Sequence, residues 1–372
     1  VASGQDATDA SVASTGDSGN IVLTAPRIMV EAAALLDAGV INSGGSNWAA
    51  GDVRLIAKAS SNGSSLLGLA DADASIDVAG TLKGRDIDLQ AGIASEAVYA
   101  GVDAVLTQGA IGLALRALGS PINFNLSYTE ATGDASIHLA SSADLQATDD
   151  ISLRATAERA AGAVLQSVTS TGSNLGAGFA RVQGSAKVDI DAGAKLTAAD
   201  TIEVVAATKT DITMSSGAMS FSGPLGVASP LPSVVFAGSL SDVTTAVNVG
   251  DGAVLTSGGD TVVQAFHSGQ YQTKAQVTVY GDGPAGVVGA LSMQESSTKV
   301  SMAGDVDAGG HVKVMAMNAS AINQTTASSE NAQVADLLGL LTLPATLQPT
   351  SDVEKSQLAS SFMTLAGTVG AL

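Results

Sequence analysis

The sequence predicts an all-β chain that forms an elongated parallel β-helix, a β-solenoid in which the strands of successive repeats stack on one another. A cassette of two alternating strands around a Gly/Ala/Asp turn, closed by an alanine, recurs five times. The composition combines 42 glycines with only 3% aromatic residues, which suits thin layers with tight corners around an aliphatic interior. No cassette can bury its apolar face alone, so neighbouring copies must cover one another.

The five close copies cover residues 75–91, 136–155, 187–206, 246–265 and 299–316, and a looser copy with an insertion in its turn covers residues 27–57. The third copy reads KVDIDAGAKLTAADTIEVVA. Alternation with period two indicates a strand with one dry and one wet face. The residues of this copy that we expect to point inward are Val188, Ile190, Leu196, Ile202, Val204 and Ala206.

The spacing of the cassettes predicts how many layers the chain forms. The closing alanines are Ala91, Ala155, Ala206, Ala265 and Ala316, and the intervals between them are long and uneven. A solenoid coil usually takes about 20 to 30 residues, so each interval, roughly twice that length, should hold two coils and a variable loop. Roughly 15 coils at about 4.8 Å each predict a rod on the order of 70 Å long.

The stretches between the cassettes are apolar and poor in charge. Short helices are expected over residues 110–118, 332–341 and 353–365, with residues 332–372 forming an apolar or helical insertion and a final strand. Apolar excursions of this kind are candidate contacts with other subunits or with copies of the same chain. The candidate contact residues are Leu113, Leu115, Leu118, Leu225, Val227, Leu337, Leu338, Leu340 and Leu341, together with Trp48 in a polar insertion.

Charge narrows the classes of partner. The chain carries 16 basic and 35 acidic residues, a formal net charge of −19. This charge repels phosphate backbones and anionic lipid surfaces, so no nucleic-acid partner is expected. No apolar run reaches the roughly 18 residues that a membrane-spanning helix needs, so no transmembrane span is expected. The absence of cysteine is compatible with secretion by a bacterium.

The residues that could carry chemistry form no convincing site. Asp86 with Asp88, and Asp149 with Asp150, would suit a polysaccharide-cleaving β-helix, but outward carboxylates also keep an exposed sheet soluble. The remaining acidic candidates are Asp251 and Asp260 in GDGAVLTSGGD, which has the composition of a calcium turn without its tandem GGxGxD spacing. We therefore predict no catalytic residue and no cofactor, with calcium as the alternative.

The three histidines also show no ligand spacing. His138, His267 and His311 occupy different cassettes, and no HxxxH pattern joins them to one another or to a neighbouring ligand. His138 and His311 align with outward polar positions or turns, so we expect them to be single exposed residues.

Strings such as VNVGDGAVLTSGGDTVVQA and VDIDAGAKLTAADTIEVVA resemble the repeats of large bacterial exoproteins of the filamentous-haemagglutinin-like adhesin type. The resemblance covers about residues 27–316. It implies a right-handed parallel β-helix, an extracellular or cell-surface location, and a role in adhesion to host or matrix surfaces or in building a biofilm matrix. Three functions remain open: a non-catalytic adhesive rod, a self-assembling subunit of a filament or sheath, and a polysaccharide-degrading enzyme.

Overall fold

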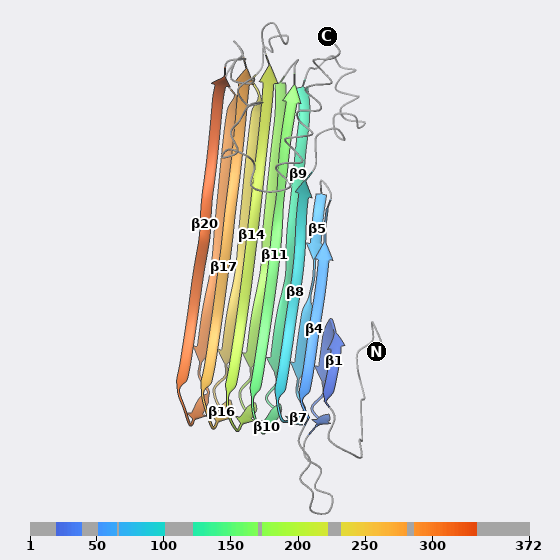
Figure 1. Cartoon of the computed structure of the whole chain (residues 1–372), viewed down its shortest axis with the longest axis vertical. Coiled ribbons are helices and arrows are strands. Elements are labelled where there is room, and N and C mark those ends of the chain that lie inside the picture. Colours follow the sequence, from blue (N-terminus) through green and yellow to red (C-terminus); the bar gives the residue numbers. More distant parts are fainter. Residues whose placement is uncertain are drawn as a thin grey trace, which may run out of the picture.

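The structure is a computed structural model, and it describes residues 20–38, 51–64, 67–100, 122–169, 173–221, 232–280 and 286–332. These residues form strands joined by short turns and contain no helix, and hence no helix that could cross a membrane. All the strand pairs are parallel and belong to three sheets, here named A, B and C. Two sheets of long strands lie face to face, and a sheet of short strands lies across one end of both (Figure 1).

Sheet A has seven strands, which are neighbours in the order β1 (Ile21–Ala25), β4 (Val53–Asn62), β8 (Ile87–Ala100), β11 (Ile151–Thr169), β14 (Ile202–Phe221), β17 (Thr261–Tyr280) and β20 (Val312–Ala332). Sheet B has the order β2 (Arg27–Val30), β6 (Ala74–Val78), β9 (Ile122–Leu139), β12 (Ser173–Ile190), β15 (Val234–Val249) and β18 (Val287–Met302), and β5 (Leu67–Asp71) also pairs with β9. Sheet C has the order β3 (Leu35–Asp37), β7 (Thr81–Gly84), β10 (Asp144–Ala147), β13 (Lys195–Ala198), β16 (Val254–Ser257) and β19 (Asp305–Ala308).

The chain visits the sheets in a fixed sequence. From β9 in sheet B it passes through β10 in sheet C to β11 in sheet A, and it then returns to sheet B as β12 beside β9. We call one such B, C and A set a strand triplet. Each triplet adds one strand to every sheet, so equivalent residues of successive triplets become direct neighbours.

The closing alanines form a single column on the inner face of sheet A. The pairings run from Ala57 to Ala91, then to Ala155, Ala206, Ala265 and Ala316. The interval between two closing alanines is therefore one strand triplet, and the expectation of two coils per interval is wrong. The extra residues lengthen the strands, which reach 21 residues in β20.

This correction changes the proportions of the molecule. The strands β14 and β17 have 20 residues each. At about 3.3 Å per residue such a strand spans roughly 66 Å, whereas the seven layers of sheet A stack over only about 30 Å. The long dimension therefore runs along the strands and not along the stacking direction (Figure 1). Sheet A also tapers, since β1, β4 and β8 have 5, 10 and 14 residues.

The predicted inward phase is confirmed where the cassettes lie. All six inward residues predicted for the third cassette are buried, from Val188 to Ala206. They belong to an aliphatic core that sheets A and B share with sheet C, whereas Asp191 and Lys195 are exposed. A second apolar core, which includes Ala161, Ile212 and Tyr271, lies between the parts of sheets A and B that are distant from sheet C, at the top in Figure 1.

Several predicted features lie outside the described residues. These are the helix over 110–118, the segments after Ala332, and all ten candidate contact residues. Ala332 itself is the last residue of β20.

Candidate functional site

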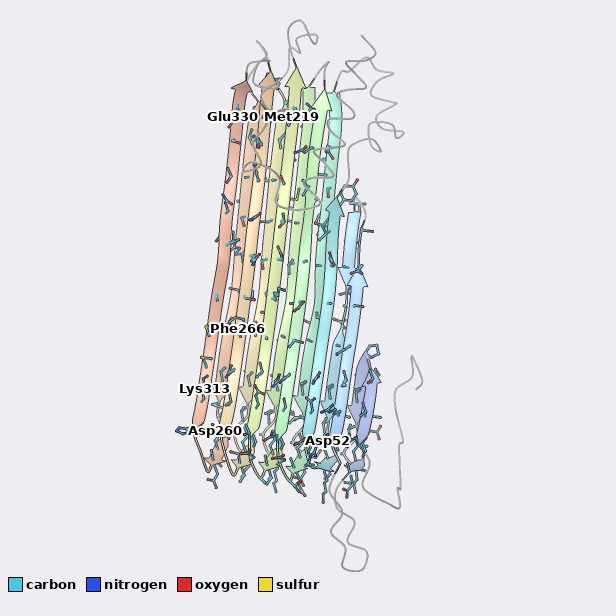
Figure 2. All side chains as sticks on the ribbon, viewed as in Figure 1. Asp52, Met219, Asp260, Phe266, Lys313 and Glu330 are labelled. Carbon is cyan, nitrogen blue, oxygen red and sulfur yellow. The ribbon has the colours of Figure 1, made fainter. Side chains whose placement is uncertain are left out.

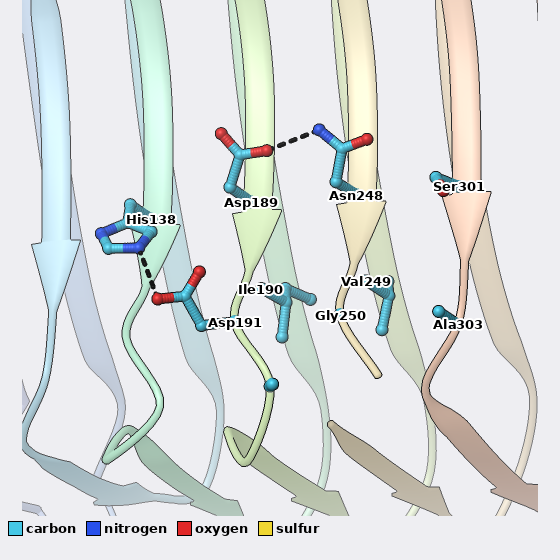
Figure 3. Close-up of a pocket in the computed structure, with 10 residues that line it drawn as sticks. His138, Asp189, Ile190, Asp191, Asn248, Val249, Gly250, Ser301 and Ala303 are labelled. Atoms are coloured by element: carbon cyan, nitrogen blue, oxygen red, sulfur yellow. Dashed lines mark hydrogen bonds and ion pairs between the residues drawn. The ribbon is translucent and has the colours of Figure 1, made fainter. Parts of the chain in front are cut away.

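A row of polar side chains crosses the outer face of sheet B close to the turns into sheet C. In register, Asp77 of β6 neighbours His138 of β9, followed by Asp189 of β12, Asn248 of β15 and Ser301 of β18. We call these five residues the outer polar row. Figure 3 shows four of them side by side on adjacent strands, above an open depression of about 430 Å³.

Four members of this row form two pairs, Asp77 with His138 and Asp189 with Asn248, and Asp191 of the following turn also binds His138. The Nε2 atom of His138 lies 3.1 Å from Oδ2 of Asp191, and its Nδ1 lies 3.5 Å from Oδ1 of Asp77. The Asn248 amide donates a hydrogen bond of 2.6 Å to Asp189. Because both imidazole nitrogens face carboxylates, His138 has no nitrogen left to activate a neighbouring hydroxyl. The row can exchange hydrogen bonds with a hydroxyl-rich surface, but it lacks the paired nucleophile and base of an esterase-like site.

A second column of polar residues immediately precedes the strands of sheet A. The carboxylate of Asp150 accepts a hydrogen bond from the Thr201 amide at 2.9 Å, and Asp260 accepts one from the His311 amide at 2.8 Å. Asn20 accepts from the Asp52 amide in the same way. These side chains therefore satisfy backbone donors of the next triplet. The hydrogen bond from the His311 amide also lowers the pKa of Asp260.

This corner is the one place where the described residues gather acidic ligands. Oxygen atoms of Asp86, Asp149 and Asp150 lie within 4.8 Å of one another, and the neighbouring charge of Asp150 raises the pKa of Asp149. Arg85 binds Asp86 at 3.1 Å, which supplies a cation without a metal. Calcium takes six to eight oxygen ligands. Three carboxylates, with a guanidinium beside them, fall short of such a site.

The two calcium candidates from the sequence do not converge. Asp260 uses its carboxylate on the His311 backbone, while Asp251 is exposed in the turn between β15 and β16. Asp88 is not part of the acidic corner. Its carboxylate accepts a hydrogen bond from Gln90 on the same strand.

A polar layer, which the sequence did not reveal, separates the two apolar cores. Arg159 on β11 is only 2% exposed and reaches across to sheet B, where its guanidinium donates to the carbonyl oxygens of Gly133 and Ser185. Burial lowers its pKa to about 10, and Asp134 opposes that shift. The glycines at 133 and 184 have φ angles of 138° and 137°. The absence of a side chain at Gly184 leaves room for the guanidinium, whereas a Cβ at Gly133 would collide with the carbonyl oxygen of Ala72.

His267 belongs to the same layer and is buried. Its Nδ1 lies 2.7 Å from Oγ1 of Thr208, and its Nε2 lies 3.2 Å from the Tyr271 hydroxyl. Thr208 in turn contacts Oγ1 of Thr245 on sheet B at 2.5 Å. Burial lowers the pKa of His267, and the Arg159 charge adds to the shift. These groups join sheet A to sheet B, and none of them opens onto the surface.

The upper part of sheet B exposes apolar and aromatic residues. Tyr128 and Phe179 are register neighbours whose rings stack at a centroid distance of 5.9 Å. Phe236, Leu291 and Met293 continue this surface toward β18. Tyr128 and Phe179 lie outside the cassettes, so the cassette pattern does not indicate that they are neighbours.

Comparisons of the chain with protein-family models, with curated proteins and with solved structures find no match.

Proposed function

We propose that this chain is a non-catalytic structural or adhesive segment, a right-handed parallel β-helix of the kind found in filamentous-haemagglutinin-like exoproteins. In this proposal each strand triplet is one coil, and the stack presents two broad, stiff faces to its surroundings. Its place would be outside the cell, on a bacterial surface or in a biofilm matrix. The resemblance of the repeats supports the location and the handedness.

The observation that carries the proposal is the unbroken column of inner residues. Ala57, Ala91, Ala155, Ala206 and Ala265 are register neighbours, and every one of them is at most 1% exposed. A repeat array of this type stabilises each layer through its neighbours. Backbone hydrogen bonds between long strands then give a stiff body, as a scaffold or an adhesive surface requires.

The use of the acidic residues supports a non-catalytic role. Asp150 and Asp260 hold backbone amides of the next triplet, and Asp189 holds Asn248. A general acid or base needs a carboxyl group free to exchange a proton with a substrate. The carboxylates of Asp150 and Asp260 are bound to backbone amides within the stack, and those of the outer polar row face outward as a hydrogen-bonding surface.

The test is a binding assay on the whole chain. Immobilised protein is exposed to a panel of matrix proteins and of neutral and anionic polysaccharides, and we expect saturable binding to at least one of them. The control is Asp189→Ala with Asn248→Ala, which removes the centre of the outer polar row without changing the core. Release of reducing or unsaturated sugars from any polysaccharide would instead show an enzyme, and absence of binding to every surface would contradict an adhesive role.

A subunit of a self-assembling filament is the second candidate. It is favoured by the last triplet, β18, β19 and β20, each of which has a hydrogen-bonded neighbour on only one side among the described strands.

A further inference from the structure

The last strand triplet presents core residues that its predecessors bury. Val312 and Val314 on β20 are 51% and 48% exposed, whereas their register partners Thr261 and Val263 on β17 are at 0%. Both sheets end in this way, because β18 follows β15 at the same end of the stack. A parallel stack of this kind accepts another layer wherever its last strand is unpaired.

The end strand β20 lacks the devices that usually prevent such pairing. Unpaired edge strands are commonly short or carry charges and prolines. β20 has 21 residues, contains no proline, and carries only two charged residues, Lys313 and Glu330. Figure 2 shows these two near opposite ends of the strand, and both are exposed.

We propose that this end is the interface for a second copy of the chain, which docks tail to tail about a two-fold axis so that each β20 pairs antiparallel with the other. The opposite end of the stack cannot fill this role. Its strands β1, β2 and β3 have only 5, 4 and 3 residues, so a head-to-tail copy would leave most of β20 uncovered. Two identical ends match in length by symmetry.

The charges of β20 define the register. Antiparallel pairing places Lys313 of each copy opposite Glu330 of the other, and opposite charges directly across a strand pair are favourable. Both side chains lie on the outer face of the sheet, since Lys313 follows the inward Val312 and Glu330 follows the inward Ser329. One register therefore forms two equivalent ion pairs.

A β-bulge in β20 lets this register place inward residues opposite inward residues and outward residues opposite outward ones. The pairing of β20 with β17 shifts by one residue between Ser320 and Ile322, so inward positions are even-numbered before the bulge and odd-numbered after it. With Lys313 opposite Glu330, the inward Val314 then meets Ser329, and Ala316 meets Ala327. Without the extra residue, every inward side chain would face an outward one.

The two-fold axis that pairs β20 with its copy also pairs β18 of sheet B with its copy. The axis crosses β20 between Ala321 and Ile322. Asn318 of β20 donates to Ser296 of β18 at 2.7 Å, and Asn323 and Gln294 bind each other at 3.0 and 3.1 Å. The position opposite the axis in sheet B is therefore Glu295. Pairing of β18 with its copy around Glu295 keeps inward residues opposite inward ones, with Gln294 meeting Ser296, so one rotation joins both sheets.

The central Glu295 meets its own copy in this arrangement. Like charges opposite one another weaken pairing. Neutralising Glu295 removes this repulsion and should strengthen association. An arrangement that does not place Glu295 beside its own copy predicts no such gain.

The experiment measures the mass of the whole chain by sedimentation equilibrium over a concentration series. We expect a dimer of twice 36.4 kDa. Lys313→Glu alone and Glu330→Lys alone should each raise the dissociation constant about tenfold, because each turns two attractive contacts into repulsive ones. The double variant K313E/E330K should restore the wild-type value, and Glu295→Gln should lower the constant. The matched control is Lys209→Glu, an exposed reversal on β14 away from the end.

Two results would overturn the proposal. One is a monomer at every concentration, which is the outcome if residues 333–372 or a further repeat cover this end. The other is a dimer or polymer in which the double variant is no better than the single ones. Neither result bears on adhesive binding, so the proposed function and this interface fail separately.

Discussion

At the residue scale, the joint between the two cores depends on a few side chains that a pattern of alternating apolar residues cannot reveal. Arg159, Thr208 and His267 all point inward at positions where an aliphatic residue would be expected. A buried guanidinium costs free energy unless its donors find acceptors. The Nε and Nη2 atoms of Arg159 find them, whereas Nη1 has no hydrogen-bond partner among the described residues. The acceptors are the carbonyl oxygens of Gly133 on β9 and Ser185 on β12, and a side chain at Gly184 would crowd the guanidinium that reaches them.

Gly184 tests this joint. A Cβ atom at this position would collide with the Gly133 carbonyl oxygen and would lie 2.8 Å from a guanidinium nitrogen of Arg159, at a φ of 137°. We expect Gly184→Ala to destabilise the fold by about 3 kcal/mol or more, because strain and collision add. The matched control is Gly252→Ala, which also has a positive φ but has no atom within 4 Å. The control should cost only about 1 to 2 kcal/mol. Chemical denaturation midpoints compare the two, and equal losses would contradict this account.

His267 predicts how stability depends on pH. Its folded-state pKa is lowered by burial and by Arg159. Between the ordinary value of about 6.5 and the lower folded value, only the unfolded chain takes up a proton. Stability should therefore be greatest above a pH of about 6.5 and should fall as the pH drops below it. Thermal unfolding of the wild type and of His267→Gln across this range measures the effect. The variant should lose part of the slope, and an unchanged slope would contradict a neutral buried imidazole.

At the element scale, the inner alanine column sets how closely the two long sheets approach. Ala206 is fully buried between Ala155 and Ala265 of the adjacent strands, whereas the next residue, Ala207, points outward. Ala206→Leu should overpack this column and destabilise the chain by about 1 to 3 kcal/mol. Ala207→Leu adds the same side chain outside and should change stability by less than about 0.5 kcal/mol. Similar denaturation midpoints for both variants would contradict the assigned faces.

The elements also explain what the sequence can and cannot reveal. The phase of each cassette is readable because Val188, Ile190 and their equivalents alternate strictly with polar residues. The alternation becomes obscure beyond the closing alanines, where β14 points Thr208 and Thr210 inward and Ser216 further along. The pattern therefore predicts a short strand, a loop and a second coil where β14 continues as one long strand.

At the scale of the whole molecule, the unrecognised long strands also explain the error in the predicted shape. Each cassette interval forms one layer of long strands, so the chain is a tapered slab with few layers and not a thin rod with many. The sequence predicts the candidate site less well than it predicts the fold. Asp77, His138 and Asp189 are distant in sequence, and only the register of β6, β9 and β12 brings them together.

The central claim, that each cassette interval is a single layer, is tested most directly by one distance. The chain has no cysteine, so Asp88→Cys and Lys313→Cys place two spin labels cleanly. These outer-face positions lie in one column of sheet A, four strands apart. Electron–electron double resonance, with labelled chain diluted in unlabelled chain, should give a distribution centred at about 20 Å, since four steps of about 4.8 Å separate the sites. A distance of about 40 Å, which two layers per interval would give at the same spacing, would contradict the claim.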